Sequence, residues 1–103
     1  MARKIVWTDP AVEDLEATVE YIARDSEAYA ASFAQSIVDA AESLGDLARR
    51  GRVVPEWGVS TVRELLVGRY RRIYKLEADR VLLVAVIHGS REIETAWRQR
   101  ERR

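Results

Sequence analysis

The sequence predicts an α+β fold in which a two-helix hairpin packs on a small antiparallel β-sheet, in the order β-α-α-β-β-β. Two consecutive segments repeat apolar residues every three or four positions, which is typical of amphipathic helices. The chain after residue 62 is rich in β-branched and aromatic residues and is divided by short turns, which is typical of strands. The 103 residues suffice for one hydrophobic core and not for two, so we expect a single domain over residues 1–103.

The first predicted strand covers residues 3–7, and the first predicted helix follows it directly. Asp9 is the expected N-cap and Pro10 the first helical residue, where its missing N–H costs no hydrogen bond. This helix is expected to end near residues 24–25. Its apolar face carries Val12, Leu15, Val19 and Ile22.

The second predicted helix begins after Ser26, whose hydroxyl is a good N-cap. We expect Gly51 to end it, because Arg49 and Arg50 just before that glycine suit the negative end of a helix dipole. Residues 51–61 are then a loop. The apolar face carries Ala30, Phe33, Ile37, Ala41, Leu44 and Ala48.

Three strands are predicted after this loop, over residues 62–67, 70–77 and 80–88. Only Gly68 and Arg69 separate the first two, which favours a two-residue hairpin turn of type II′. The third strand is apolar on both faces, so we place it inside the sheet. The expected core comprises Val12, Leu15, Val19, Ile22, Phe33, Ile37, Leu44, Leu65, Ile73, Leu83, Ala85 and Ile87.

Composition excludes several kinds of site. The chain has no cysteine and one histidine, and it has neither a phosphate-binding glycine loop nor a dinucleotide fingerprint, so we expect no metal and no cofactor. The longest uncharged apolar run, residues 81–87, is far too short to span a membrane. The N-terminus has no apolar signal segment. We therefore expect a cytoplasmic protein without membrane contact.

Charge is unevenly distributed along a chain whose net charge is zero. Residues 1–62 contain 6 Lys and Arg against 11 Asp and Glu, whereas residues 63–103 contain 11 against 6. This asymmetry indicates one region that faces an anion or an acidic partner. The alternative is that solvated faces segregate without functional meaning.

A candidate site arises where the last two strands meet. The meander is expected to bring Arg71 close to His88, with Arg91 just beyond, and this set suits a phosphate. The guanidinium groups would stabilise the charge formed when a ribose 2′-hydroxyl attacks its phosphodiester, and His88 would exchange the proton. Alternatively, the arginines pair with carboxylates and the histidine is structural; residue types alone favour this second interpretation.

The sequence resembles the RelE/ParE superfamily of bacterial toxins in short motifs that cover nearly the whole chain. The resemblance implies the toxin of a type II toxin–antitoxin system, which arrests growth and is neutralised by a cognate antitoxin in a hetero-oligomer. The motifs are, in order, Thr8-Asp9-Pro10-Ala11-x2-Asp14-Leu15, Tyr21-Ile22, Gly51-Arg52-Val53-Val54-Pro55-Glu56, Arg63-Glu64-Leu65, Gly68-Arg69-Tyr70-Arg71-Arg72-Ile73-Tyr74 and His88-Gly89-Ser90-Arg91.

The resemblance leaves two activities open. In the branch that cleaves mRNA on the ribosome, it implies Arg71, Arg91 and His88 as catalytic residues. Trp97 stands where that branch carries a catalytic tyrosine, and the residues where it carries lysines are Val62, Glu64 and Leu66.

The ending His-Gly-x-Arg and the loop at residues 51–56 are more similar to the ParE branch, which is linked to DNA gyrase and plasmid stabilisation, so we favour that branch. The expected target-binding residues are then Arg69, Arg72, Trp97 and Arg98, the last two in a basic tail over residues 91–103. A third possibility is an inactive protein that only binds a partner.

Overall fold

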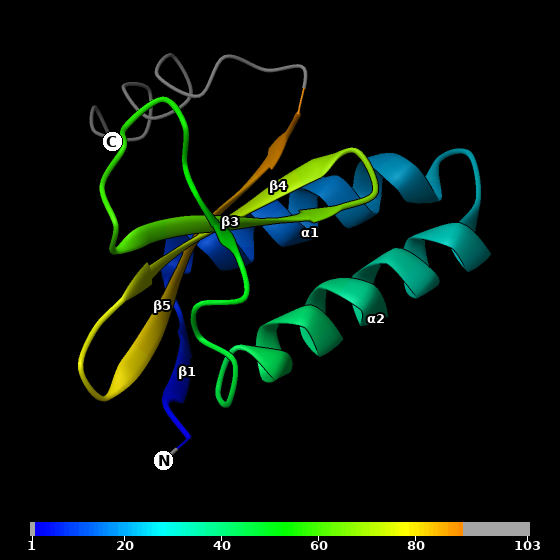
Figure 1. The fold of residues 1–103 in the computed structure, drawn as a ribbon. Coiled ribbons are helices and arrows are strands. Elements are labelled where there is room, and N and C mark those ends of the chain that lie inside the picture. The colour runs from blue at the N-terminus through cyan, green and yellow to red at the C-terminus, as the bar shows by residue number, and fades with distance from the viewer. Residues whose placement is uncertain (1, 90–103) are drawn as a thin grey trace.

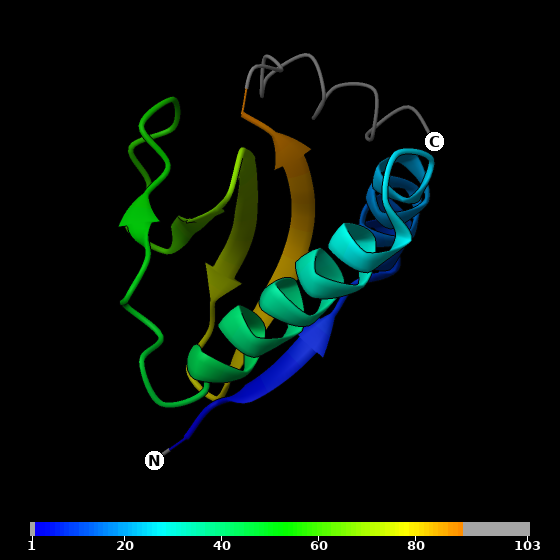
Figure 2. The same cartoon turned by 90° about the vertical axis from the view of Figure 1, so that its right-hand side faces the viewer.

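The computed structural model describes residues 2–89, which form two helices and one five-stranded sheet (Figure 1). Figure 2 shows both helices on the same side of the sheet. The strand order is β1-β5-β4-β3-β2. Within these residues, no helix is long and apolar enough to cross a lipid bilayer. The elements are β1 (Lys4–Trp7), α1 (Asp9–Ala23), α2 (Glu27–Ser43), β2 (Arg52–Val53), β3 (Val62–Val67), β4 (Tyr70–Leu76) and β5 (Arg80–His88).

The α+β fold with a helical hairpin on a sheet is confirmed, but the sheet is mixed and not purely antiparallel. β1 pairs in parallel with β5, from Lys4 opposite Arg80 to Trp7 opposite Leu83. No tight turn joins these two strands, so nothing local imposes an antiparallel direction on them. The predicted loop over residues 51–61 also contains the short strand β2, which pairs with β3.

The antiparallel meander of β3, β4 and β5 is confirmed. Gly68 has a φ of +58°, and no non-glycine residue among those described has a positive φ, so the turn has its left-handed residue first, as the type II′ prediction requires. A bulge interrupts the pairing of β4 with β5, because Ile73 opposes Ala85 whereas Tyr74 opposes Leu83. The bulge leaves Val84 as the extra residue of β5.

Thr8, not Asp9, is the N-cap of α1. The Thr8 hydroxyl accepts a hydrogen bond from the Ala11 N–H at 3.4 Å and donates one to the Leu83 carbonyl at 2.7 Å. The Thr8 N–H also donates to that carbonyl, so the start of the helix is fixed to β5. These contacts across the chain outweigh the capping preference of Asp9, which becomes the first helical residue. Ser26 caps α2 as predicted.

The helix α2 ends at Ser43, well before the predicted end at Gly51. The Gly45 carbonyl accepts a hydrogen bond from the Arg3 N–H at 2.7 Å, which draws the chain out of the helix and toward the N-terminal strand. A Cβ at Gly45 would lie 3.1 Å from the Arg3 carbonyl oxygen, so the small residue permits this approach. Residues 44–51 therefore cross the end of the sheet and do not extend the helix.

The hydrophobic core lies on both faces of the sheet. The cluster under the helices includes Ala11, Ala41, Leu44, Ala48, Tyr74, Leu76, Val81 and Leu83. The opposite face, which the helices leave open, carries Val54, Ile73, Ala85 and Ile87.

Burial confirms seven of the expected core residues, namely Phe33, Ile37, Leu44, Ile73, Leu83, Ala85 and Ile87. Val12 is wrongly predicted, since it is 36% exposed. Leu15, Val19, Ile22 and Leu65 are only half-buried. Among the described residues α1 buries only Ala11 completely, so its apolar face is covered less than its periodicity indicates.

Candidate functional site

A closed network of ion pairs surrounds Arg71 on the open face of the sheet. The Arg71 Nη1 and Nη2 atoms donate to the two carboxylate oxygens of Glu56 at 2.6 and 2.8 Å, and Nε donates to Glu64 at 2.7 Å. The second Glu64 oxygen accepts from Arg52 Nε at 2.7 Å. Arg71 is 7% exposed and Glu64 1% exposed. β3 and β4 place Glu64 and Arg71 on the same face, and Glu56 reaches them from the loop between β2 and β3.

The network keeps both partners of the Arg71–Glu56 pair ionised. The hydrogen bond from Arg71 lowers the pKa of Glu56 to about 2, and the hydrogen bond to Glu56 raises the pKa of Arg71. The Arg71 guanidinium is thus already hydrogen-bonded to two carboxylates through Nε, Nη1 and Nη2. The alternative in which strand-end arginines pair with carboxylates is confirmed for Arg71. Sequence reasoning did not identify Glu56 and Glu64 as partners of Arg71. The alternation of residues along β3 could have indicated that Glu64 shares a face of the sheet with Arg71.

Arg71 and His88 do not approach one another as predicted. The register pairs Tyr70 with His88 and Arg71 with Ile87, and directly opposite residues share a face of the sheet. Arg71 and His88 therefore lie on opposite faces. The His88 ring instead stands edge-on to Tyr70, with ring centroids 5.1 Å apart.

Arg72 is fully buried on the helix side of the sheet, so its side chain forms no part of the surface that was expected to bind a target. Within residues 2–89, its three guanidinium nitrogens have no hydrogen-bond partner. Its Cζ atom lies 5.4 Å from the centroid of the Trp7 ring, a cation–π arrangement. Burial lowers the pKa of Arg72 to about 10.

Of the other predicted site residues, the structure describes Arg69, which is exposed in the turn between β3 and β4. The Arg69 carbonyl accepts a hydrogen bond from the Gly89 N–H at 2.7 Å, so the end of β5 is fixed to this turn. Arg91, Trp97, Arg98 and the rest of the tail over residues 91–103 lie outside the described residues. Their catalytic and target-binding roles stay predictions.

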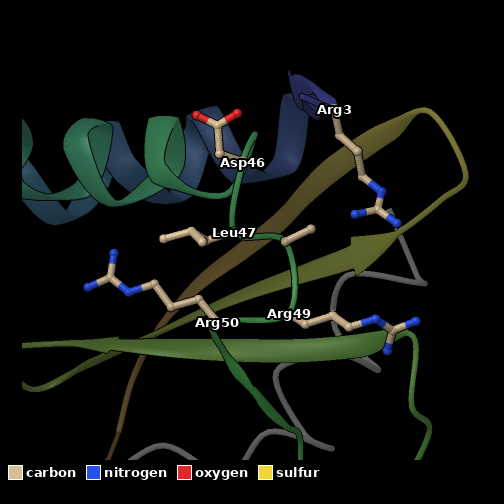
Figure 3. A pocket seen from close by; sticks show the side chains of 6 residues that line it. Arg3, Asp46, Leu47, Arg49 and Arg50 are labelled. Carbon is tan, nitrogen blue, oxygen red and sulfur yellow. The ribbon is translucent and has the colours of Figure 1, made fainter. Parts of the chain in front are cut away.

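Sequence reasoning did not identify the hollows in the surface. One, of about 310 Å³, lies on the open face and is apolar apart from one lysine; its lining is Trp57, Val59, Val62, Lys75 and Val84. Another, of about 500 Å³ and here called the basic hollow, lies where residues 46–50 pass Arg3 (Figure 3). Its lining is Arg3, Asp46, Leu47, Ala48, Arg49 and Arg50.

The described residues contain no group of three or more histidine, aspartate or glutamate side chains placed to hold a metal ion. Above its buried apolar cluster, the open face carries the charge network, the apolar hollow and exposed apolar side chains such as Leu66, which is 60% exposed.

Comparison with known proteins identifies the family. Residues 5–93 match the family model of the ParE toxin of the type II toxin–antitoxin system parDE. No curated protein sequence matches the chain.

Two solved structures share the fold. The chromosomal ParDE toxin–antitoxin system from P. aeruginosa aligns with a TM-score of 0.69 and 21% identity, over 84% of this chain and 96% of that one. The toxin–antitoxin complex RelBE2 from Mycobacterium tuberculosis aligns with a TM-score of 0.62 and 18% identity, over 85% and 99% of the two chains. The chain belongs to the ParE toxin family of type II toxin–antitoxin systems.

Proposed function

We propose that this toxin arrests bacterial growth by binding DNA gyrase in the cytoplasm, and that a cognate antitoxin neutralises it by forming a complex with it. The alternative within the superfamily is cleavage of mRNA on the ribosome. The observation that favours gyrase binding is the closed network around Arg71.

Phosphodiester cleavage would require free donors at the position where charge develops in the transition state. Arg71 directs its donors at Glu56 and Glu64, and both carboxylates would repel an incoming phosphate. Freeing the guanidinium would leave the fully buried Glu64 with one partner fewer, which is costly. His88, on the other face of the sheet, is not placed to exchange a proton at the same phosphate.

A binding function is supported by the apolar surface that the open face presents. Leu66 is 60% exposed and Val59 47% exposed, and Val59 and Trp57 line the apolar hollow. Exposed apolar groups gathered on one face are typical of a protein–protein interface. We propose that the target contact extends from this face through Arg69 to the tail, with Trp97 as an aromatic anchor and Arg98 as an orienting charge.

The decisive experiment expresses the chain alone in a bacterium and assays the purified protein in two reactions. Gyrase supercoiling should be inhibited, ribosome-bound mRNA should stay intact, and co-expression of the small protein encoded beside the toxin should restore growth. Ribosome-dependent mRNA cleavage would contradict the proposal. Normal growth with neither activity would favour an inactive protein that only binds its partner.

Two variants separate a catalytic from a structural role of Arg71. Arg71→Ala removes the guanidinium. Glu64→Gln disturbs the same network but retains the Arg71 guanidinium. If the protein were a nuclease, Arg71→Ala should lower the cleavage rate by about 100- to 1000-fold, whereas Glu64→Gln should not. This loss corresponds to about 2.7–4 kcal/mol of transition-state stabilisation from one charge-stabilising donor. We expect instead that both variants lower stability together and that neither reveals a cleavage activity.

A further inference from the structure

We propose that the basic hollow is a docking site for an acidic segment of the antitoxin that carries an apolar anchor residue. This inference rests on the proposed antitoxin partner and adds the place and the chemistry of one contact with it. Three arginines surround the hollow, and a single carboxylate, that of Asp46, lines it.

The positive charge of these arginines is not neutralised within the described part of the chain. Arg3 Nε donates to the Glu77 backbone carbonyl at 3.1 Å, and Arg50 Nη1 donates to the Ser43 hydroxyl at 2.8 Å. Both acceptors are uncharged, so they hold the side chains in place and leave the charges unpaired. Arg49 is exposed and has no hydrogen-bond or ion-pair partner among residues 2–89.

Three other arginines of the sheet are paired with carboxylates. Arg52 and Arg71 both bind Glu64, and Arg80 forms an ion pair with Glu77. The basic hollow, in contrast, gathers three arginines that have no carboxylate partner among residues 2–89. Figure 3 shows the side chains of Arg3 and Arg49 extending on the same side of the loop, while that of Arg50 extends in the opposite direction.

The loop that carries Arg49 and Arg50 is held in one conformation by a buried tyrosine. The hydroxyl of Tyr74 donates to the Ala48 carbonyl at 2.9 Å and accepts from the Gly51 N–H at 2.9 Å. A Cβ at Gly51 would lie 2.5 Å from the Tyr74 hydroxyl oxygen, so only glycine fits this position. A loop fixed in this way loses little conformational entropy when a partner binds.

The apolar part of the hollow distinguishes an acidic peptide from a nucleic acid. Leu47 is 59% exposed in the hollow, and the buried Ala48 lies next to it. A phosphate backbone has no apolar group that would cover Leu47. In an acidic peptide, an apolar side chain would cover Leu47, and the glutamate or aspartate residues on either side of it would place their carboxylates near Arg3 and Arg49.

The test measures the dissociation constant of the toxin–antitoxin complex for the wild type and three toxin variants. Arg49→Glu and Leu47→Ser alter the hollow at exposed side chains, so both variants should fold. Arg24→Glu makes the same charge change at the exposed end of α1 and is the matched control. We expect Arg49→Glu to weaken binding by about 10- to 100-fold and Leu47→Ser by about 5- to 10-fold, with Arg24→Glu within twofold of the wild type. Raising the salt concentration from 50 to 300 mM should weaken wild-type binding more than that of Arg49→Glu.

Equal dissociation constants for the wild type, Arg49→Glu and Leu47→Ser, with unchanged circular dichroism, would overturn the docking site and leave the antitoxin proposal intact. Failure of the antitoxin to bind even the wild type would contradict the proposed function instead. A 12-residue peptide of alternating glutamate and leucine then replaces the antitoxin as the probe. Binding of this peptide that is lost in Arg49→Glu supports the site, and absence of binding overturns it. Tighter binding of a 12-nucleotide DNA through the same residues would also overturn it.

Discussion

Arg71 and Glu56 form a two-point ion pair across the open face of the sheet, with Nη1–Oε2 and Nη2–Oε1 distances of 2.6 and 2.8 Å. The pair connects β4 to the loop between β2 and β3, which also carries Trp57 of the apolar hollow. Glu64 of β3 accepts a hydrogen bond from the same guanidinium, so the Arg71 side chain links the loop, β3 and β4. These ion pairs therefore connect three segments of the open face above the buried apolar cluster of Val54, Ile73, Ala85 and Ile87.

Glu64→Gln should be among the most destabilising single changes on this face. Its carboxylate is 1% exposed and binds both Arg52 and Arg71, so the amide introduced by the substitution would leave Arg71 with Glu56 as its one carboxylate and would direct an N–H group at one of the two guanidinium groups. We expect the free energy of unfolding to fall by about 1–3 kcal/mol, as measured by urea denaturation. Glu77→Gln, in the exposed pair with Arg80, is the control and should leave it nearly unchanged. Equal effects of the two changes would contradict a structural role for the network.

Acid should weaken the fold through Glu56. Its pKa is lowered from 4.5 to about 2 in the folded protein, so the unfolded chain binds more protons between these values. The stabilisation is fully present above about pH 4.5 and is lost as the pH falls through about 2. The side chain is 36% exposed, so we expect the loss to be limited to about 1–2 kcal/mol. Urea denaturation of the wild type and Glu56→Gln at a series of pH values should show a smaller slope for the variant in this range.

Replacing Arg72 with methionine should stabilise the protein. Arg72 is buried with no hydrogen-bond partner in residues 2–89, and only the Trp7 ring offsets the loss of its hydration. A buried charge without full compensation is less favourable than an apolar side chain of similar volume. We expect a gain of about 1–2 kcal/mol in thermal or urea denaturation. A marked loss of stability in Arg72→Met would show that the charge has a partner that matters for folding.

Tyr74→Phe should release the loop of residues 48–51. The substitution removes the hydroxyl that binds both the Ala48 carbonyl and the Gly51 N–H, and the rest of the buried ring is retained. We expect a loss of about 1–3 kcal/mol in stability, together with faster hydrogen exchange of the Gly51 amide. Ser43→Ala, which removes the hydroxyl contacts with Arg50 and with the Ala40 carbonyl and leaves those of Tyr74 intact, should leave that amide protected.

Deletion of residues 99–103 tests the proposed role of the basic tail in target binding. The truncated chain should still fold and should still bind the antitoxin. Growth arrest and gyrase inhibition should become weaker, because charges that orient the toxin on its target are lost. Replacing the deleted segment with five alternating serine and glycine residues separates charge from length. Full toxicity of a stable truncated protein would exclude this role.

The local elements of this protein were accessible from the sequence because they depend on neighbours in the chain. The period of apolar residues identified both helices, the Ser26 cap followed from its hydroxyl, and the glycine between residues 62–67 and 70–77 identified the type II′ turn. The family followed from motif order in the same way, and the match over residues 5–93 confirms it.

Tertiary structure decided the features in which distant segments compete for the same groups. The parallel pairing of β1, the replacement of Asp9 by Thr8 as the cap and the early end of α2 at Ser43 all arise from contacts across the chain. The pleat of β4 puts Arg71 and Arg72 on opposite faces, and the packing of both helices on one side decides that the Arg72 face is the one they cover. Composition shows which charges a chain carries, but whether each guanidinium has a carboxylate, a neutral oxygen or an aromatic ring beside it depends on the packed strands.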